Sequence, residues 1–300
     1  MKPYLQLMRP PNLPTAMSDV AAGAAIAAFF VKEQLPDWAL LETLPFNHLA
    51  LLLFATVCLY AGGVVMNDVF DADIDAVERP ERPIPSGRVP LEHARIMGLT
   101  LLLAGVLASF AVNALCGGVA LAVALLALVY DRYAKHQSFW GPFTMGLCRA
   151  GNLLLGMSWL GQWQPIYVLI MTTPLAYIAS ITYISRFEVR GGNAQKLGRT
   201  FTWELWAIIS PTILGNSVAH NLWQPLPFVL LLMMLITPPL AKAQKEPTPE
   251  NIKKAVKARV IGLIALNAAW AAAFGGWQWG VAALMLMPIS RLLAKTFAVT

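Results

Sequence analysis

Residues 47–75 read NHLALLLFATVCLYAGGVVMNDVFDADID, a long apolar run that passes directly into a cluster of aspartates. The apolar part approaches the roughly 20 residues that a helix needs to cross the hydrocarbon core of a bilayer. If the helix continues past this run, Asp68, Asp71 and Asp75 are spaced i, i+3 and i+7 and their carboxylates share one face. The segment therefore predicts a membrane-spanning helix with three acidic side chains at one end.

The rest of the chain has the same apolar character. Of its 300 residues, 57% are hydrophobic and only 13% are charged, and the mean hydropathy is +0.59. Soluble domains carry roughly 25% charged residues, so this chain has too little polar surface for water. Ten apolar runs have about the length of a span, near 13–31, 47–66, 94–113, 115–130, 140–160, 165–184, 203–221, 225–241, 258–275 and 277–295.

These runs predict an all-α, polytopic transmembrane helix bundle that forms a single domain over residues 1–300. The third and fourth runs are separated by an expected turn at 116–118. The last two meet at Gly275 and Gly276, so nine spans are the alternative to ten. With ten spans and a cytoplasmic N-terminus, every lysine and arginine except Lys32 lies on the cytoplasmic side, as the positive-inside rule requires. The net charge of +6 reflects this topology, because the basic residues lie in short loops and form no stripe typical of nucleic-acid binding.

The aspartate cluster is the candidate for chemistry. Three carboxylates at the edge of an apolar span repel one another and require compensating cations. Mg²⁺ prefers carboxylate oxygens and often takes phosphate oxygens as further ligands. Arg79 and Arg82 follow closely and offer planar donors to carboxylate or phosphate. A solvated acidic helix cap is the competing interpretation, but the direct contact with an apolar span favours a binding site.

At this point the sequence resembles a known family. NDVFDADID, beginning at Asn67, matches the NDxxDxxxD motif of the UbiA superfamily of intramembrane prenyltransferases, and RPIPSG, beginning at Arg82, matches its RPxPSG continuation. LMRPPNLPT at 7–15, YDRYAK at 130–135 and GLCRAGNLLLG at 146–156 look like further parts of the same family. The resemblance extends over essentially the whole chain.

The resemblance implies a helix bundle around a central cavity that binds an isoprenyl diphosphate through Mg²⁺ and transfers the isoprenyl group to a small acceptor. Carried onto this chain, Asp68, Asp71 and Asp75 hold Mg²⁺. Asn67 orients the diphosphate, and Arg82 and Lys135 stabilise the departing charge. These roles agree with the physics of the reaction, since fixed cations and a metal stabilise the leaving group while apolar walls exclude water.

The second acidic motif of the family is altered here. The segment 185–200 reads SRFEVRGGNAQKLGRT, and the three acidic positions hold Ser185, Glu188 and Gly192. Glu188 alone keeps a carboxylate and is the remaining candidate for a catalytic acid in this loop. Two hypotheses follow: basic residues such as Arg186 bind the diphosphate directly beside a single Mg²⁺, or the second site has degenerated. The altered loop also resembles the EboC-like branch of the superfamily.

Polar residues elsewhere in the apolar runs are further candidates for substrate binding. Arg149 and Asn152 lie within the fifth run, where polar side chains usually face the bundle interior. Arg9 and Asn12 open the first run near the same end. The first functional hypothesis is an Mg²⁺-dependent prenyltransferase with cytoplasmic active-site loops, expected in a bacterial inner membrane and in contact with membrane lipid. The alternative is a non-catalytic binder or carrier of an amphipathic metabolite.

Overall fold

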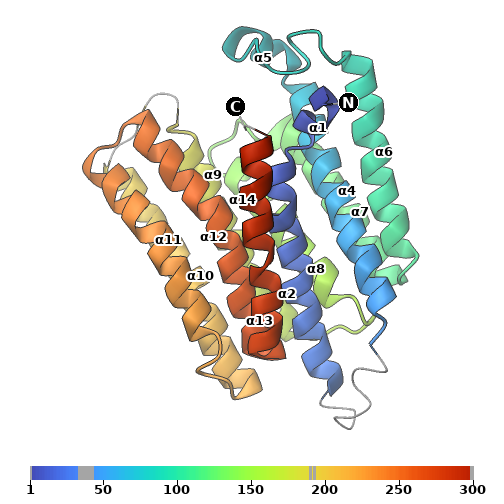
Figure 1. Ribbon diagram of the computed structural model, residues 1–300, viewed down its shortest axis with the longest axis vertical. Helices are drawn as coiled ribbons and strands as arrows, with labels where there is room; N and C mark the ends of the chain where they lie inside the picture. Colours follow the sequence, from blue (N-terminus) through green and yellow to red (C-terminus); the bar gives the residue numbers. More distant parts are fainter. Residues whose placement is uncertain (1, 33–43, 189–190, 192–193, 298–300) are drawn as a thin grey trace.

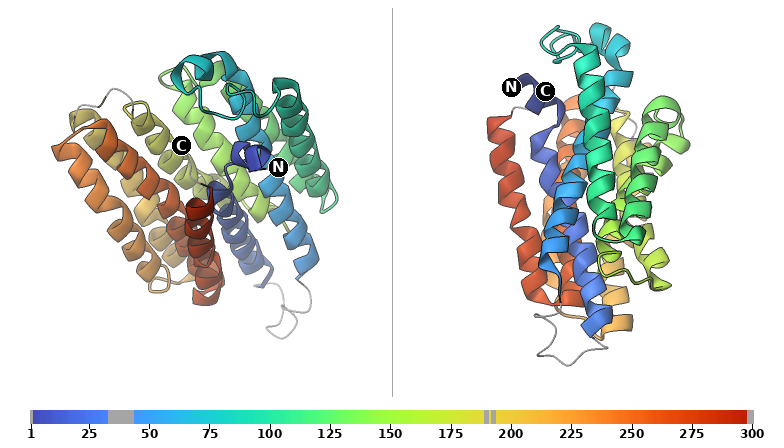
Figure 2. Two further views of the ribbon diagram at one scale, coloured as in Figure 1. Left: turned by 45° about the horizontal axis from the view of Figure 1, so that its top comes forward. Right: turned by 90° about the vertical axis from the view of Figure 1, so that its right-hand side faces the viewer.

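The computed structural model describes residues 2–32, 44–188, 191 and 194–297, but not the side chains of 194–197, 199, 201 and 202. Within these ranges the chain is helical and contains no β-strand, as predicted. The helices run roughly parallel to one long axis, and the two ends of the described chain lie at the same end of the bundle (Figure 1). That end also carries the short helices α1 and α5, which Figure 2 shows from two further sides.

The elements follow one another along the chain in this order: α1 (Lys2–Leu7), the 3₁₀ turn η1 (Pro10–Asn12), α2 (Leu13–Lys32), α4 (Phe46–Phe70), α5 (Ala72–Glu78), α6 (Leu91–Phe110), α7 (Ala114–Val129), the π-helical turn η3 (Tyr130–Ala134), α8 (Trp140–Met157), α9 (Ile166–Ser185), α10 (Ala194–Ala219), α11 (Leu226–Lys245), α12 (Pro249–Gly275), α13 (Trp277–Leu284) and α14 (Leu286–Thr296).

Seven helical stretches in the described part are long and apolar enough to cross a membrane, and they are Pro10–Lys32, Phe46–Phe70, Leu91–Phe110, Ala114–Ala134, Ile166–Ser185, Leu226–Lys245 and Pro249–Gly275. The other three predicted runs form α8, α10 and the pair α13 and α14. The last pair is interrupted because Pro288 lacks an N–H and its ring opposes the carbonyl four residues earlier, at Leu284. The protein is thus an all-helical integral membrane protein.

The centre of the bundle is built from small residues. Helices α2 and α12 pack together, and both are rich in alanine. Residues 268–273 of α12, five alanines and Trp270, are all fully buried. Without a hydrophobic driving force in lipid, small residues stabilise helix contacts by allowing close approach. Gly23 of α2 and Gly156 of α8 show this, because a Cβ on either glycine would collide with the backbone of the facing helix.

The periphery has the opposite character. Leu99, Leu103 and Leu107 project from one face of α6 at intervals of four residues, and all are exposed. Leu121, Leu125 and Val129 form a similar exposed stripe on α7. Soluble proteins rarely expose contiguous apolar surfaces of this kind, so these faces suit contact with lipid.

The predicted turn at 116–118 is wrong. Helix α6 ends at Phe110 and α7 already begins at Ala114, so Cys116, Gly117 and Gly118 lie within α7. The helix begins earlier because the Asn113 side chain accepts a hydrogen bond of 2.8 Å from the Cys116 backbone N–H. Asparagine is among the strongest N-cap residues. The predicted break after Gly275 is confirmed, because α12 ends there and Gly276 adopts a positive φ of 93°.

Candidate functional site

The aspartates lie where α4 meets α5, at the end of the bundle that carries both ends of the described chain. Helix α4 ends at Phe70, and Asp71 has φ −92° and ψ 4°, outside regular helix geometry. Backbone hydrogen bonds from Asp71 N–H to Asn67 and from Asp75 N–H to Asp71 nevertheless continue the helical path. Asp68 and Asp75 are both only 5% exposed and share the cation Arg82, whereas Asp71, at the kink, pairs with Lys135.

Arg82 joins two of these carboxylates. Its Nη1 lies 2.6 Å from Asp75 Oδ2 and 3.3 Å from Asp68 Oδ1. The loop between α5 and α6 carries Arg82 back over the aspartates, and its side chain is largely buried. Buried carboxylates need such partners, because an uncompensated charge at the edge of a low-dielectric region is costly. The geometry makes Arg82 the bridge between the two ends of the motif.

The third carboxylate has a different cation. Lys135 Nζ forms an ion pair with Asp71 Oδ1. Lys135 follows η3, the π-helical turn that widens the end of α7, and such turns are frequent at functional sites. The same turn presents Asp131, whose Oδ1 accepts a hydrogen bond of 2.8 Å from Asn67 Nδ2. The α4 motif and the α7 end are thus linked by two contacts.

Arg9 closes this cluster from the N-terminal side. Its Nη2 donates to Asp68 Oδ1 at 2.7 Å. Arg9 has φ 47° and ψ 64°, the left-handed conformation that non-glycine residues adopt only at a cost. It immediately precedes η1, whose two prolines restrict the local backbone. Strained backbone is maintained where the surrounding structure requires it, and here it accompanies the Arg9–Asp68 contact.

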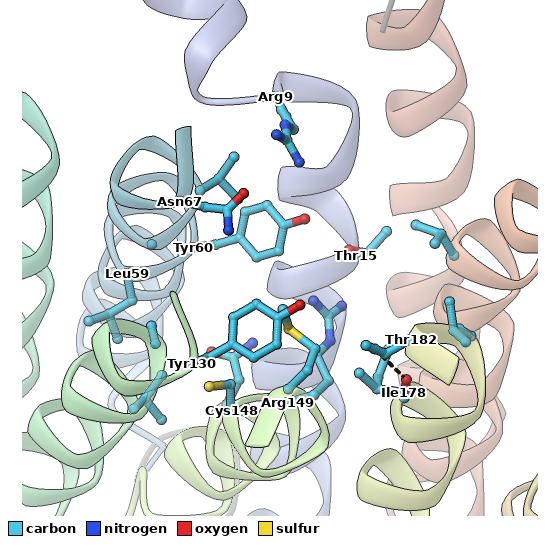
Figure 3. A pocket seen from close by; sticks show the side chains of 18 of the residues that line it. Arg9, Thr15, Leu59, Tyr60, Asn67, Tyr130, Cys148, Arg149, Ile178 and Thr182 are labelled. Atoms are coloured by element: carbon cyan, nitrogen blue, oxygen red, sulfur yellow. Dashed lines mark hydrogen bonds between the residues drawn. The ribbon is translucent and has the colours of Figure 1, made fainter. Parts of the chain in front are cut away.

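A cavity of about 400 Å³ extends from this cluster into the bundle. Its outer part is polar and is lined by Arg9, Asn67, Tyr130 and Asp131, while the deeper walls are mainly aliphatic. Figure 3 shows the rings of Tyr60 and Tyr130 with their hydroxyl groups directed toward the side where Thr15 and Thr182 lie. A polar mouth over an apolar interior suits an amphipathic ligand with a charged head.

A second polar network lies deeper, against the cavity wall. Asp19 of α2 is fully buried and its Oδ2 lies 2.6 Å from Arg149 Nε. Asn152 donates to the same oxygen at 2.8 Å, and Asn267 of α12 donates to Asp19 Oδ1 at 2.6 Å. Thr56 of α4 donates to the amide oxygen of Asn152 at 2.6 Å. Four helices are therefore connected through one carboxylate at the place predicted for Arg149 and Asn152.

The remaining predicted residues lie farther from the cavity or at its edge. Arg186 is exposed, and its Nη2 donates to the backbone carbonyls of Lys135 and Gln137. Asn12 is half-buried at the end of η1, where its carbonyl accepts from the Thr15 hydroxyl at 2.7 Å. Neither residue is among those that line the cavity, and their predicted part in substrate binding stays a prediction.

The altered second motif is described only in part. Ser185 ends α9 and lines the cavity, whereas Gly192 lies outside the described residues. Glu188 is half-buried, and this burial raises its pKa above the ordinary value of 4.5, against the opposing effect of Lys253 and Arg79. These two opposing cations belong to α12 and to the end of α5.

The sequence analysis missed four buried acidic or basic groups. Asp131 lines the cavity, and Asp19 holds Arg149. Glu204 of α10 and Arg259 of α12 form a fully buried pair, with Nε–Oε1 at 2.5 Å and Nη2–Oε2 at 3.0 Å. The rarity of charges inside apolar runs could have identified Asp19 and Glu204, because intramembrane ionisable residues usually pair or serve a function.

The chemistry of the cluster suits a hard divalent cation, since Asp68, Asp71 and Asp75 offer carboxylate oxygens. In the described part of the chain, no three acidic, histidine or cysteine side chains converge on one point as a metal site requires. Each carboxylate is instead held by a cationic side chain. The ligand types fit Mg²⁺, and the three cations supply the charge that the carboxylates need without it.

Comparisons with known proteins give a consistent result. Residues 20–249 match the UbiA prenyltransferase family. The chain is 32% identical over 239 residues to digeranylgeranylglyceryl phosphate synthase of Sulfolobus acidocaldarius, covering 77% of this chain and 79% of that one. It is 35% identical over 165 residues to the protein of the same name from Methanococcoides burtonii, covering 54% of this chain and 56% of that one.

Solved structures show the same fold. One from a study of digeranylgeranylglyceryl phosphate synthase in membranes has a TM-score of 0.66 and 23% identity, and covers 92% of this chain and 98% of that one. A UbiA homologue from Archaeoglobus fulgidus bound to GPP and Mg²⁺ has a TM-score of 0.56 and 15% identity, and covers 94% of this chain and 99% of that one. At these identities the likeness concerns the fold.

Proposed function

The chain belongs to the UbiA prenyltransferase family and is therefore a prenyltransferase that acts on prenyl diphosphates. We propose that its reaction takes place in the cavity that α2, α4, α7, α8, α9 and α12 line. The observation that carries the proposal is the pairing of Asp68, Asp71 and Asp75 with Arg9, Arg82 and Lys135, in a cluster that adjoins the cavity through Arg9 and Asn67. Both the ligands for a metal and the cations for a diphosphate are thus at one place.

The charged residues at the mouth divide into two roles. Asp68, Asp71 and Asp75 would hold Mg²⁺, whose charge would stabilise the departing diphosphate. Arg82 and Lys135 donate to phosphate oxygens, since guanidinium and ammonium groups form strong charge-assisted hydrogen bonds with phosphate. Asn67 orients the head group from the adjacent turn of α4, opposite Asp131.

The deeper cavity holds the isoprenyl chain and protects the reaction from water. Its aliphatic wall includes Leu59, Val123, Ile178 and Ile181. Breaking the bond between the first isoprenyl carbon and the diphosphate oxygen gives an allylic cation, which water would capture in an open site. An apolar wall favours capture by the intended acceptor instead.

The altered 185–200 loop modifies the family scheme in this proposal. Glu188 is the carboxylate that remains, and it lies near Arg79 and Lys253. We therefore infer a single Mg²⁺ site in the first motif, with cationic side chains in place of a second metal.

The acceptor follows from the names of the relatives. Digeranylgeranylglyceryl phosphate carries two geranylgeranyl groups on one glyceryl phosphate. We infer an acceptor of the same class, a singly prenylated glyceryl phosphate with a free hydroxyl. The hydroxyl oxygen bonds to the first carbon of the allylic group, the diphosphate leaves from that carbon, and the hydroxyl proton is released to the solvent side.

The topology belongs to the same proposal. We place the aspartate end of the bundle and both ends of the described chain in the cytoplasm, with nine or ten spans, in agreement with the distribution of lysine and arginine. The expected bacterial inner membrane and the EboC-like branch stay predictions, and the relatives named above come from archaea. The carrier hypothesis gains no support from those relatives, which are named as synthases.

Thermal unfolding in detergent tests the diphosphate site. Geranylgeranyl diphosphate with Mg²⁺ should raise the unfolding temperature, because a ligand at about 100 times its Kd stabilises the folded state by about 2.7 kcal/mol. Asp71→Asn should lose the Mg²⁺-dependent shift and turnover. Asp73→Asn is the matched control, since Asp73 lies on α5 but is exposed, and it should behave as the wild type. Normal turnover in Asp71→Asn would refute the assignment.

A further inference from the structure

Arg149, which lines the cavity, carries a hydrogen-bond donor without a partner. Arg149 is 8% exposed and lines the cavity, and its Nη2 is buried and has no hydrogen-bond partner among the described residues. Leaving a buried charged donor unsatisfied costs free energy, and native structures rarely do so without a reason. Figure 3 shows Arg149 together with Tyr60 and Thr15 among the residues that line the cavity.

The guanidinium group is held in place from behind. Asp19 Oδ2 lies 2.6 Å from Arg149 Nε, and Asn152 and Asn267 fix the orientation of Asp19. On the cavity side, the guanidinium carbon lies 6.0 Å from the centroid of the Tyr60 ring, a distance at which cations interact with aromatic faces. Asp19, Asn152 and Asn267 are therefore positioning residues, and Nη2 is the atom that they present.

The charge balance determines the kind of ligand atom. Arg149 and Asp19 form a neutral pair, and the neighbours in contact with the pair, Asn152, Asn267 and the Tyr60 ring, carry no charge. A carboxylate or phosphate at Nη2 would leave a net negative charge deep in a region of low dielectric, which is strongly unfavourable. A hydroxyl, ether or carbonyl oxygen would satisfy the donor and add no charge. The chemistry therefore favours an uncharged oxygen.

The position of Arg149 determines which substrate supplies that oxygen. Tyr60, which Arg149 contacts, precedes Asn67 by seven residues on α4, and this separation corresponds to about 10 Å along a helix. The diphosphate is bound by the charged groups at the mouth, and an isoprenyl chain contains no oxygen. The oxygen at Nη2 must come from the acceptor.

We propose that Arg149 is the acceptor-recognition residue and that its Nη2 donates a hydrogen bond to an uncharged oxygen of the prenylated glycerol acceptor. This inference rests on the proposed function, because it assigns the inner end of the same cavity to the second substrate. A singly prenylated glyceryl phosphate has two such oxygens, its ether oxygen and its free hydroxyl.

The test is a comparison of Arg149→Lys with wild type. Lysine keeps the positive charge beside Asp19 but removes the donor at Nη2. With geranylgeranylglyceryl phosphate as the probe, the KM of the acceptor should rise about 10- to 100-fold, the range expected for one hydrogen bond to a charged donor. The KM for geranylgeranyl diphosphate should stay within about twofold, because the proposal assigns Arg149 to the acceptor alone. A similar rise in both KM values would indicate a general defect.

Arg259→Lys is the matched control. Arg259 is also a buried arginine paired with a carboxylate, but it pairs with Glu204 and is not among the residues that line the cavity. It should change protein stability and leave the KM of the acceptor as in wild type. An equal rise in KM in both variants, or no rise in Arg149→Lys, overturns the proposal.

Binding of probes without turnover separates this inference from the proposed function. Geranylgeranylglycerol, which lacks the phosphate, should stabilise the wild type against heat and lose that effect in Arg149→Lys. An Arg149 dependence that is confined to the phosphorylated probe would show that the group bound is anionic and would overturn the proposal. Stabilisation by both probes without transfer of a geranylgeranyl group would instead contradict the proposed reaction. If neither probe stabilises the wild type, the inference about Arg149 is overturned.

The wild type provides a test that does not depend on folding of the variant. Two analogues of the phosphorylated probe replace either the ether oxygen by a methylene group or the free hydroxyl by hydrogen. One of them should bind about 10- to 100-fold more weakly, as expected when a buried charged donor is left unpaired. If both bind as tightly as the parent, Arg149 does not recognise an uncharged oxygen.

Discussion

The buried pair of Glu204 and Arg259 allows a quantitative prediction. Both side chains are 0% exposed, and the two contacts of 2.5 and 3.0 Å make the pair bidentate. Ser180 donates to Glu204 Oε1 at 2.9 Å, and Arg259 Nη1 contacts the carbonyl of Ala255. Replacing Arg259 by methionine removes the cation but leaves the carboxylate between α9, α10 and α12.

The expected loss is large because the remaining charge has no route to water. Breaking a fully buried pair on one side typically costs about 3–5 kcal/mol. Arg259→Met should therefore lower the free energy of unfolding by about 4 kcal/mol, the middle of that range. The double variant Glu204→Leu with Arg259→Met removes both charges, and such replacements are often neutral or stabilising by about 1–4 kcal/mol.

Denaturant-induced unfolding in detergent, followed by tryptophan fluorescence, measures both variants against the wild type. Most of the loss in Arg259→Met should be recovered in the double variant. Retention of the Mg²⁺-dependent shift by geranylgeranyl diphosphate is the control, since neither residue is among those that line the cavity. A loss below about 1 kcal/mol in the single variant, the value of an exposed pair, would refute the reasoning.

Two further predictions concern packing and pH. Gly23→Ala should destabilise the protein by about 1–3 kcal/mol, because the added Cβ would meet backbone atoms of α8. Gly118→Ala should stabilise it by up to about 1 kcal/mol, because a Cβ at position 118 meets no other atom and alanine favours the helix. The shift of the unfolding midpoint measures both effects. Burial raises the pKa of Glu188, so the folded state binds its proton more tightly than the unfolded state and stability falls as pH rises through the folded pKa. Glu188→Gln should therefore unfold at a higher temperature than wild type at about pH 7.5 but not at about pH 4, and equal differences at both pH values would contradict this.

Most of the fold could be predicted from the sequence, because apolar runs of span length fold as helices in lipid. All ten predicted runs correspond to helical segments, although α13 and α14 divide the last one. The misplaced turn before α7 shows the limit of hydropathy. Residues 116–118 look like a turn by composition, but the Asn113 cap begins the helix before them, and the cap acts through one specific hydrogen bond.

The site could be predicted only where its residues are close in sequence. The spacing of Asp68, Asp71 and Asp75 indicated a shared face, and the structure holds their carboxylates with three cations. Asp131 and Asp19 were not predicted, because their importance depends on contacts with Asn67 and Arg149 across the bundle. The 64 residues that separate Asn67 from Asp131 carry no local pattern that would reveal their contact.

The two polar layers of the cavity suggest how the chain separates its substrates. Near the mouth, cations compensate carboxylates, and the proposed function makes them available to an anionic head group. At the inner layer, the charges of Arg149 and Asp19 cancel one another, and the Arg149 Nη2 donor has no partner among the described residues. An anion is therefore favoured at the mouth and disfavoured at the inner layer, and an uncharged oxygen has the opposite preference. Under the proposed function, this difference orders a charged diphosphate and a hydroxyl-bearing acceptor along one cavity and puts the reacting carbon between the two layers.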